Sequence, residues 1–279
     1  MKKSILTLVL ALGLGSLSYA QIQTPQPSPA ASVSQVVGLS KVSVNYSRPS
    51  LKGRKMFGEQ LPYGKVWRTG ANQATKLTFS EDMLVNGQNV AAGSYALFTI
   101  PNPTEWTVIL SKSANSFGSF EYKPENDVLR FTVKPTKLTT PAEAFTIEFT
   151  DFTATKAMLA LRWENVEVKF PMENNPDEKI MAQIKEQTAN PAAKSDVFFA
   201  AADYYYQNNR DLKQAHEWAS KVIETQKEYW TYYLRGKIAA KMGDCKSARA
   251  DATAGLELAK KAGDDAYITN HQRILAECK

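Results

Sequence analysis

The hydrophobic pattern of this chain changes its period once, between Met172 and Asp177. Before that point, short runs of β-branched and aromatic residues alternate with polar ones, which is typical of strands with one buried face. After it, apolar residues recur at helical spacing. Runs of strands followed by runs of helices predict separate parts. We expect a β domain over residues 33–172, a linker with a short helix over residues 173–191, and an α domain over residues 192–279.

The β part consists of short predicted strands that are separated by turn residues, with no helical period between them. The clearest runs are residues 41–46, 75–80, 93–100, 105–110, 128–133, 144–149, 158–163 and 166–170. Asn86-Gly87 predicts a hairpin, because a type I′ turn needs positive φ at both central positions. Roughly nine to eleven such strands predict an antiparallel β-sandwich, or a barrel-like arrangement.

The N-terminus has the features of an export signal. Two lysines precede an apolar run over residues 5–17, and a small-residue cleavage pattern ends at Ala20. The run is shorter than the roughly 20 apolar residues that span a bilayer, so an uncleaved anchor is the less favoured alternative. We expect a signal peptide over residues 1–20 that is cleaved after Ala20, and a flexible leader over residues 21–32. The mature chain should be periplasmic or secreted, without a membrane span.

The α part repeats itself at a spacing of 33 residues, which brings Ala215 onto Ala248 and Ala219 onto Ala252. With the aromatic residues before each turn, residues 192–279 resemble a pair of tetratricopeptide repeats. The resemblance is degenerate, since an arginine stands where the first turn usually has glycine. It implies a helical stack that binds a partner protein in its groove, and a module that only stabilises the β domain is the alternative.

The only cysteines are Cys245 and Cys278, and both belong to the α part. Cys245 opens one predicted helix and Cys278 ends the next. Consecutive helices in such a stack run antiparallel, so these two ends should lie together. In an exported protein we predict a disulfide here that holds the C-terminal helix and contributes about 3 kcal/mol. Two free buried thiols are the alternative.

The β part has no histidine, which excludes several reaction classes from it. His216 and His271 are the only histidines, and both lie in predicted helices. A Ser-His-Asp or Cys-His pair, or a His- and Cys-rich zinc site, cannot form in the β part. A phosphate-binding glycine loop and a calcium loop are also missing, so we expect no cofactor and no metal. Carboxylates near strand ends remain as acid–base candidates, and they are Glu81, Asp82, Glu121, Glu125, Asp127, Asp151 and Glu164.

The longest predicted loop of the β part, residues 46–72, is strongly basic, and we call it the basic loop. Its cations are Arg48, Lys52, Arg54, Lys55, Lys65 and Arg68. They face one acid, Glu59, which leaves a net charge of about +5. Residues 21–172 together hold 16 basic and 12 acidic residues, so this loop accounts for the excess. Export and this modest charge argue against a nucleic-acid surface.

Flat aromatic side chains accompany these cations in the basic loop. The candidate site for an anionic small molecule or a glycan consists of Arg48, Arg54, Tyr63, Trp67, Arg68 and Asn72. In the alternative interpretation, Arg68 and Asn72 hold the loop through backbone carbonyls. Trp67 and Phe57 then anchor the loop in the core.

The same segment carries a family resemblance. Tyr46-Ser-Arg-Pro-Ser50, the run Pro-Tyr-Gly-Lys-Val-Trp-Arg-Thr-Gly-Ala-Asn over residues 62–72, and residues 92–101 closely resemble domain-of-unknown-function family 2911. The resemblance spans about residues 27–171. It implies an exported bacterial protein with a β-rich domain, often followed by helical repeats, and no established activity. Our hypothesis is an exported cell-envelope binding or scaffolding protein, with a His-free hydrolase or lyase that uses loop carboxylates and Arg68 as the alternative.

Overall fold

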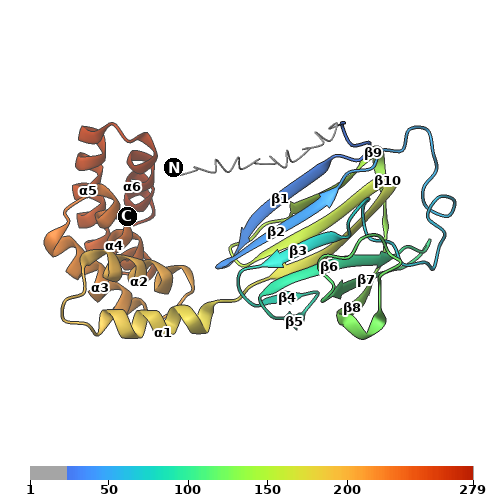
Figure 1. The fold of residues 1–279 in the computed structure, drawn as a ribbon. Helices are drawn as coiled ribbons and strands as arrows, with labels where there is room; N and C mark the ends of the chain where they lie inside the picture. Colours follow the sequence, from blue (N-terminus) through green and yellow to red (C-terminus); the bar gives the residue numbers. More distant parts are fainter. Residues whose placement is uncertain (1–23, 279) are drawn as a thin grey trace, which may run out of the picture. The chain divides into compact units, whose positions relative to one another are not determined.

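The computed structural model describes residues 24–278, which form two compact units that divide between Asn175 and Pro176. The first is all β and the second all α (Figure 1). The predicted antiparallel β domain followed by an α domain is therefore confirmed. The predicted signal peptide lies outside the described residues. In the part of the chain that is described, no helix is both long and apolar enough to cross a bilayer.

Ten strands build the described β unit as two antiparallel sheets. One sheet has the order β1-β2-β3-β6-β7-β8, and the other has the order β5-β4-β10-β9. The strands are β1 (Ala30–Val37), β2 (Ser40–Ser47), β3 (Thr75–Phe79), β4 (Met83–Val85), β5 (Gln88–Val90), β6 (Gly93–Ile100), β7 (Trp106–Ser111), β8 (Asp127–Val133), β9 (Thr136–Thr150) and β10 (Lys156–Glu173). β1 begins inside the segment expected to be a leader, because all of its residues pair with β2.

The predicted hairpin at Asn86-Gly87 is confirmed. Met83 of β4 pairs with Val90 of β5. Asn86 and Gly87 have φ values of 49° and 76°, as a type I′ turn requires.

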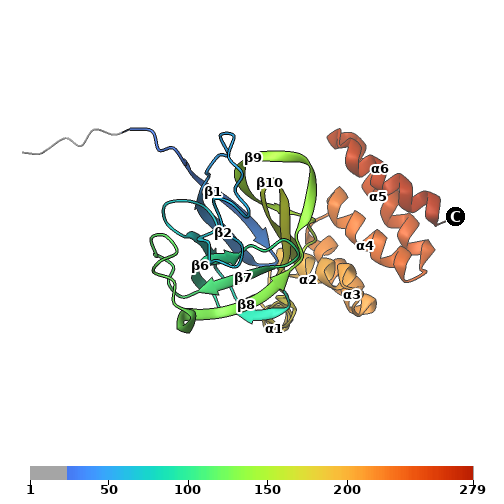
Figure 2. The same ribbon diagram turned by 90° about the vertical axis from the view of Figure 1, so that its right-hand side faces the viewer.

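The two sheets lie face to face and bury one shared hydrophobic core (Figure 2). Val42 and Val44 of β2 are fully buried, and so is Leu159 of β10 in the opposite sheet. On β2 the polar neighbours of the two valines are exposed or half-buried, which is the alternation that the period of two predicts.

Loops cover part of the outer face of the larger sheet. Phe98 and Ile109 lie on that face and are fully buried, packed with Val66 and Tyr122. The backbone of Trp67 exchanges two hydrogen bonds with Thr99 of β6, at N···O distances of 2.7 and 2.9 Å. The basic loop is therefore hydrogen-bonded into the sheet at this point.

Six helices form the described α unit. They are α1 (Asp177–Thr188), α2 (Ser195–Gln207), α3 (Leu212–Thr225), α4 (Tyr229–Lys241), α5 (Cys245–Ala262) and α6 (Asp265–Glu277). Asp211, Asp244 and Asp264 precede three of them, and each side chain accepts a backbone hydrogen bond from the first turn. The four alanines at the 33-residue spacing are all buried in α3 and α5.

Cys245 and Cys278 form a disulfide, with their Cα atoms 5.0 Å apart. Cys245 is the first residue of α5, and Cys278 directly follows α6. The bond therefore joins the residue that follows α6 to the first residue of α5.

The α unit buries a histidine and an ion pair. His271 of α6 is 0% exposed, and its Nε2 donates to the carbonyl oxygen of Tyr229 at 3.0 Å. Its Nδ1 has no hydrogen-bond partner among the described residues. Nearby, Arg235 and Asp251 form two parallel hydrogen bonds of 2.8 and 2.6 Å. Burial lowers the pKa of His271, and the Asp251 carboxylate offsets this only in part.

We expect the α unit to lose stability as the pH falls below about 6.5, the ordinary pKa of histidine. The pKa of His271 is lower in the folded state, so the unfolded chain binds more protons in this range and the free energy of unfolding decreases. Urea unfolding between about pH 7.5 and 5.5, followed by far-UV circular dichroism, measures this slope. His271→Asn should remove it. The β unit has no histidine among its described residues and is the internal control. An α-unit midpoint that does not change over this range would contradict the prediction.

Candidate functional site

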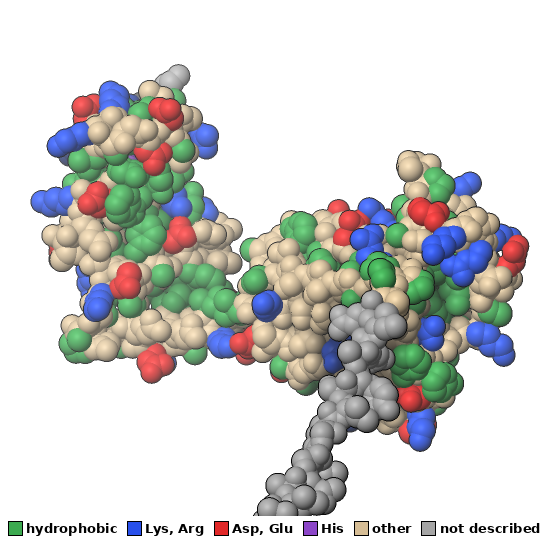
Figure 3. All heavy atoms as spheres, turned by 45° about the horizontal axis from the view of Figure 1, so that its top comes forward, with side chains coloured by type: hydrophobic (Ala, Val, Ile, Leu, Met, Phe, Trp, Pro, Cys, Tyr) green, Lys and Arg blue, Asp and Glu red, His purple; other side chains and the backbone are tan. Residues whose placement is uncertain are grey.

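The basic loop joins β2 to β3 and extends beyond the end of the sheets (Figure 1). Lys and Arg side chains gather at the same right-hand end of the β unit in Figure 3. The loop that carries the candidate residues predicted from the sequence thus lies at one end of the sandwich. Their contacts divide them into two groups, those that hold the loop and those that line a cavity.

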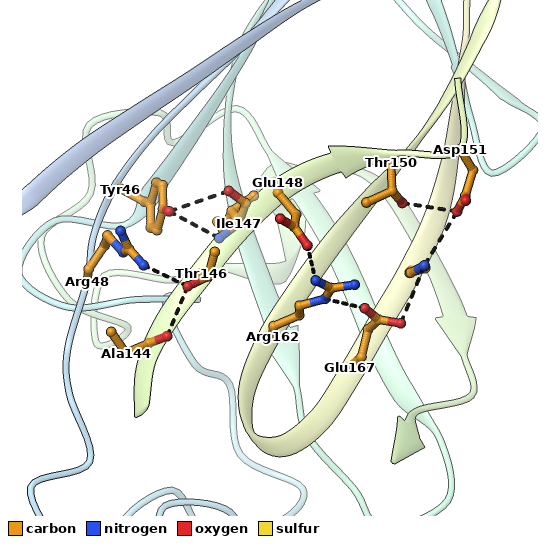
Figure 4. A network of polar contacts seen from close by, with 11 residues as sticks. Tyr46, Arg48, Ala144, Thr146, Ile147, Glu148, Thr150, Asp151, Arg162 and Glu167 are labelled. Carbon is orange, nitrogen blue, oxygen red and sulfur yellow. Dashed lines mark hydrogen bonds and ion pairs between the residues drawn. The ribbon is translucent and has the colours of Figure 1, made fainter. Parts of the chain in front are cut away.

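Arg48 belongs to the first group. Its Nε donates to the carbonyl oxygen of Phe145 at 3.1 Å. One Nη donates to Oγ1 of Thr146 at 2.8 Å (Figure 4). Both acceptors lie on β9, so Arg48 ties the start of the loop to the opposite sheet. It does not line the cavity described below.

Asn72 holds the other end of the loop. Its side-chain amide donates to Oγ of Ser47 at 3.2 Å and to the carbonyl oxygen of Ser28 at 3.4 Å. Its φ of 59° is a conformation that asparagine tolerates better than most residues. These contacts match the structural interpretation of Asn72.

Tyr63 packs within the loop and has 42% of its surface exposed. Its ring lies over Gly58, where a Cβ atom would be 2.7 Å from the ring. Gly58 also has a φ of 88°, so the turn needs glycine both for its backbone and for this close approach. Tyr63 does not line the cavity either.

Trp67 is a core anchor and is only 5% exposed. Its ring stacks on Trp163 at a centroid distance of 5.7 Å, and it meets Phe145 edge-on at 5.1 Å. Its indole N–H donates to the carbonyl oxygen of Gly70 at 3.0 Å. The loop is thus held by an aromatic cluster that joins both sheets.

Two carboxylates of the β9–β10 hairpin hold the loop backbone. Glu164 accepts hydrogen bonds from the backbone N–H groups of Met56 and Phe57. Glu143 accepts one from the N–H of Lys52 at 2.8 Å. Sequence reasoning assigned Glu164 only to acid–base chemistry and did not identify Glu143, because both contacts join residues about 90 to 110 positions apart.

Arg54, Trp67 and Arg68 meet at one cavity of about 290 Å³, which we call the arginine cavity. The other residues that line it are Ser28, Pro49, Met56, Leu61, Val66, Gly70, Ala71, Ser119 and Trp163. Three of the six candidate residues therefore share a cavity. Sequence reasoning did not identify Ser119 and Trp163, which reach the cavity from distant loops and strands.

The two arginines differ in how far their hydrogen bonds are satisfied. Arg54 donates from Nε to the carbonyl of Leu51 at 2.9 Å and from one Nη to that of Ser50 at 2.7 Å. Arg68 forms no ion pair and no side-chain hydrogen bond with any described residue, and its Nε is buried. Burying a charged donor without an acceptor costs free energy. The described residues therefore leave the hydrogen-bond donors of the Arg68 side chain without an acceptor.

A second loop, residues 113–122, closes over Arg68. A Cβ atom at Gly118 would lie 2.5 Å from the Phe120 ring and 3.3 Å from Nη1 of Arg68. Gly118 also has a φ of 74°, so the contact with Phe120 and the backbone conformation both favour glycine. The N–H of Gly118 donates to the carbonyl of Asn72 at 3.2 Å, which joins the two loops. The sequence signal that could have identified this loop is Gly118, a glycine between the apolar residues Phe117 and Phe120.

Carboxylates are absent from the described lining of the arginine cavity, and so is histidine. Several of the candidate carboxylates bind elsewhere: Asp82 to the N–H of Ala92, Glu121 to the N–H of Phe117, Asp127 to Arg130 and Asp151 to Lys169. In the described part of the chain, no cluster of His, Cys, Asp and Glu is placed to hold a metal ion. The charged side chains of the described lining are the two arginines, and no acid–base pair is among them.

The fold and the site define a class of β-sandwich domain in which a basic end loop, anchored by aromatic residues, opens on an arginine-lined cavity. Residues 28–172 match the model of the family described as Protein of unknown function (DUF2911), and the chain belongs to this family. Every residue that lines the arginine cavity falls within the matched segment. No curated protein matches this chain, and no solved structure matches it.

Proposed function

We propose that this protein is an exported cell-envelope binding protein that holds a small anionic ligand in the arginine cavity. The observation that carries the proposal is Arg68, a cavity-lining guanidinium without an acceptor among the described residues. Arg54 adds a second positive charge, and no described lining residue is acidic. At about 290 Å³ the cavity is close to the lower end of known small-ligand sites.

The alternative, a hydrolase or lyase with loop carboxylates, has less support. Among the candidate carboxylates, Glu164 contacts a residue of the cavity lining, Met56. Its oxygens already accept hydrogen bonds from the backbone N–H groups of Met56 and Phe57. A general acid or base must reach the substrate directly or through one water. The proposal is therefore ligand binding without catalysis.

We propose in addition that the α unit is a degenerate tetratricopeptide-like module for a partner protein. Its support is the 33-residue alanine spacing and an aromatic strip along α2 and α4. There, Nζ of Lys237 lies 4.5 Å from the ring centre of Tyr206 and 5.5 Å from that of Tyr233. Crosslinking in the cell envelope, with a chain that ends at Met172 for comparison, tests this part. Capture of the same proteins by both chains would contradict it.

Arg68→Ala should weaken ligand binding without weakening the free protein. A hydrogen-bonded charge is worth about 1.5–3 kcal/mol, so affinity for a small anion should fall at least about tenfold. Because Arg68 has no described acceptor, the melting temperature of the free protein should stay the same or rise. A thermal-shift screen of organic anions and glycans, followed by calorimetric titration, gives both numbers.

Lys65→Ala is the matched control, since it removes one exposed charge of the basic loop that does not line the cavity. It should change affinity little. If Arg68→Ala destabilises the free protein and leaves ligand binding intact, Arg68 is structural and the proposed site is wrong.

A further inference from the structure

We infer that the ligand of the arginine cavity is an organic acid, with an anionic group that only accepts hydrogen bonds and an apolar body. Neutral sugars and inorganic oxyanions do not meet this description. The inference rests on the proposed function, because it concerns the same cavity. It adds that the cavity favours organic acids over neutral sugars and inorganic oxyanions.

The first argument is that the described side chains of the lining are almost exclusively donors. Arg54 and Arg68 offer N–H groups and no acceptor. Ser28 and Ser119 are the only lining side chains with a hydroxyl, and no Asp, Glu, Asn or Gln is among the described lining residues. Each hydroxyl of a neutral sugar needs an acceptor for its proton. A carboxylate or phosphate oxygen needs donors alone, which this lining supplies.

The backbone of the lining adds few acceptors. The carbonyl groups of Ser28, Pro49, Met56, Leu61, Trp67, Arg68, Gly70 and Ser119 each already accept a hydrogen bond within the protein. A sugar hydroxyl could use only the second lone pair of each of these oxygens. An acid group has no proton to place, so the occupied carbonyls do not affect it.

The second argument is that one guanidinium is free for a two-oxygen contact. Nε and one Nη of Arg54 already donate hydrogen bonds to loop carbonyls, whereas the guanidinium of Arg68 has no described partner. A carboxylate or phosphate can accept two parallel hydrogen bonds from such a group. Arg68 is therefore the contact for the acid group, and Arg54 contributes mainly charge.

The third argument is the apolar surface of the rest of the cavity. Met56, Leu61 and Val66 line it with the two indoles. The indole N–H groups of Trp67 and Trp163 already donate to the carbonyls of Gly70 and Glu143, so the rings present only apolar surface. An inorganic oxyanion would leave this surface without a partner.

Exposed aromatic rings extend this apolar surface next to Arg68. Phe120 is 76% exposed and Phe117 is 54% exposed, with their ring centres 6.4 Å apart. The Phe120 ring packs over Gly118, the residue that also approaches Nη1 of Arg68. The neighbouring Ser119 lines the cavity. We therefore infer that an apolar body that extends out of the cavity on this side contacts Phe120.

The test is calorimetric titration of the mature full-length protein with matched probes. Phenylacetate and phenyl phosphate carry an acid group on an apolar body, and phenylacetamide is the neutral counterpart. Acetate and inorganic phosphate carry the acid group without the apolar body. Maltose is a neutral sugar. We expect at least one of the first two to bind about tenfold or more tighter than each of the other four, because it combines a charged hydrogen bond with apolar burial. Which of the two binds tighter distinguishes a carboxylate from a phosphate ligand.

Variants separate the two parts of the ligand. Arg68→Lys keeps the charge but loses the paired contact, so affinity for the tighter acid should fall several-fold. Phe120→Ser should weaken the phenyl acid and leave acetate unaffected. Phe152→Ser removes an equally apolar exposed ring outside the cavity lining, and should change neither.

The outcomes distinguish this inference from the proposed function. If maltose, acetate or inorganic phosphate binds as tightly as the phenyl acids and Arg68→Ala abolishes that binding, the site stands and the ligand class is wrong. If no probe binds, the class is likewise wrong. If a probe binds and Arg68→Ala has no effect on its affinity, both the inference and the proposed function are overturned.

Discussion

Trp67→Ala should lower the free energy of unfolding of the β unit by about 3–5 kcal/mol, the usual cost of truncating a buried tryptophan. Trp67 contacts the ring of Trp106 on the larger sheet and the rings of Phe145 and Trp163 on the smaller sheet. The substitution leaves a cavity in this cluster and also frees the carbonyl of Gly70 from its indole donor. The loop should therefore loosen, and the arginine cavity should lose its shape with it.

Urea unfolding followed by the fluorescence of the remaining tryptophans measures this loss. Tyr63→Ala is the matched control, because Tyr63 belongs to the same loop but is largely on the surface. It should cost less than about 1 kcal/mol. A Trp67→Ala variant that is as stable as the Tyr63→Ala variant would show that the aromatic cluster does not hold the loop.

Replacing both Cys245 and Cys278 by serine should destabilise the α unit by about 3–4 kcal/mol on the chain-entropy model. The disulfide closes a loop with a sequence separation of 33, and its loss gives the unfolded chain more conformational freedom. α6 packs against α4 and α5, so its end should separate first. Thermal unfolding followed by far-UV circular dichroism, with and without reductant, measures the effect.

The double serine variant provides the control, since reductant should not change its midpoint any further. The β unit contains no cysteine and should unfold at the same midpoint in every sample. A wild-type protein whose α unit keeps its midpoint under complete reduction would rule out a stabilising role for this bond.

Local signals in the sequence predicted most of the fold. The change of period near Met172, the Asn86-Gly87 turn and the two cysteines at helix ends each involve neighbouring residues or a simple repeat. Such features depend on backbone preferences and on which face is buried. They are therefore visible without any knowledge of distant contacts.

The site was predictable only as a list of candidates. Arg48 and Arg68 look equivalent in the basic loop, and each could have been a ligand contact or a loop anchor. What separates them is a carbonyl on β9, 97 residues from Arg48, and the absence of a described acceptor near Arg68. Trp67 likewise differs from Tyr63 only through rings on other strands. Long-range packing of this kind leaves no local signature in one sequence.

The arginine cavity also has a consequence for when the protein becomes competent to bind. Its walls come from the segment before β1, the basic loop, the loop that bears Ser119, and Trp163 on β10. These segments come together only when the two sheets have packed against each other and the backbone N–H of Met56 has bonded to Glu164. A fragment that lacks any of these segments does not contain the complete cavity. The proposed ligand would therefore bind only the folded β unit and would stabilise it by mass action.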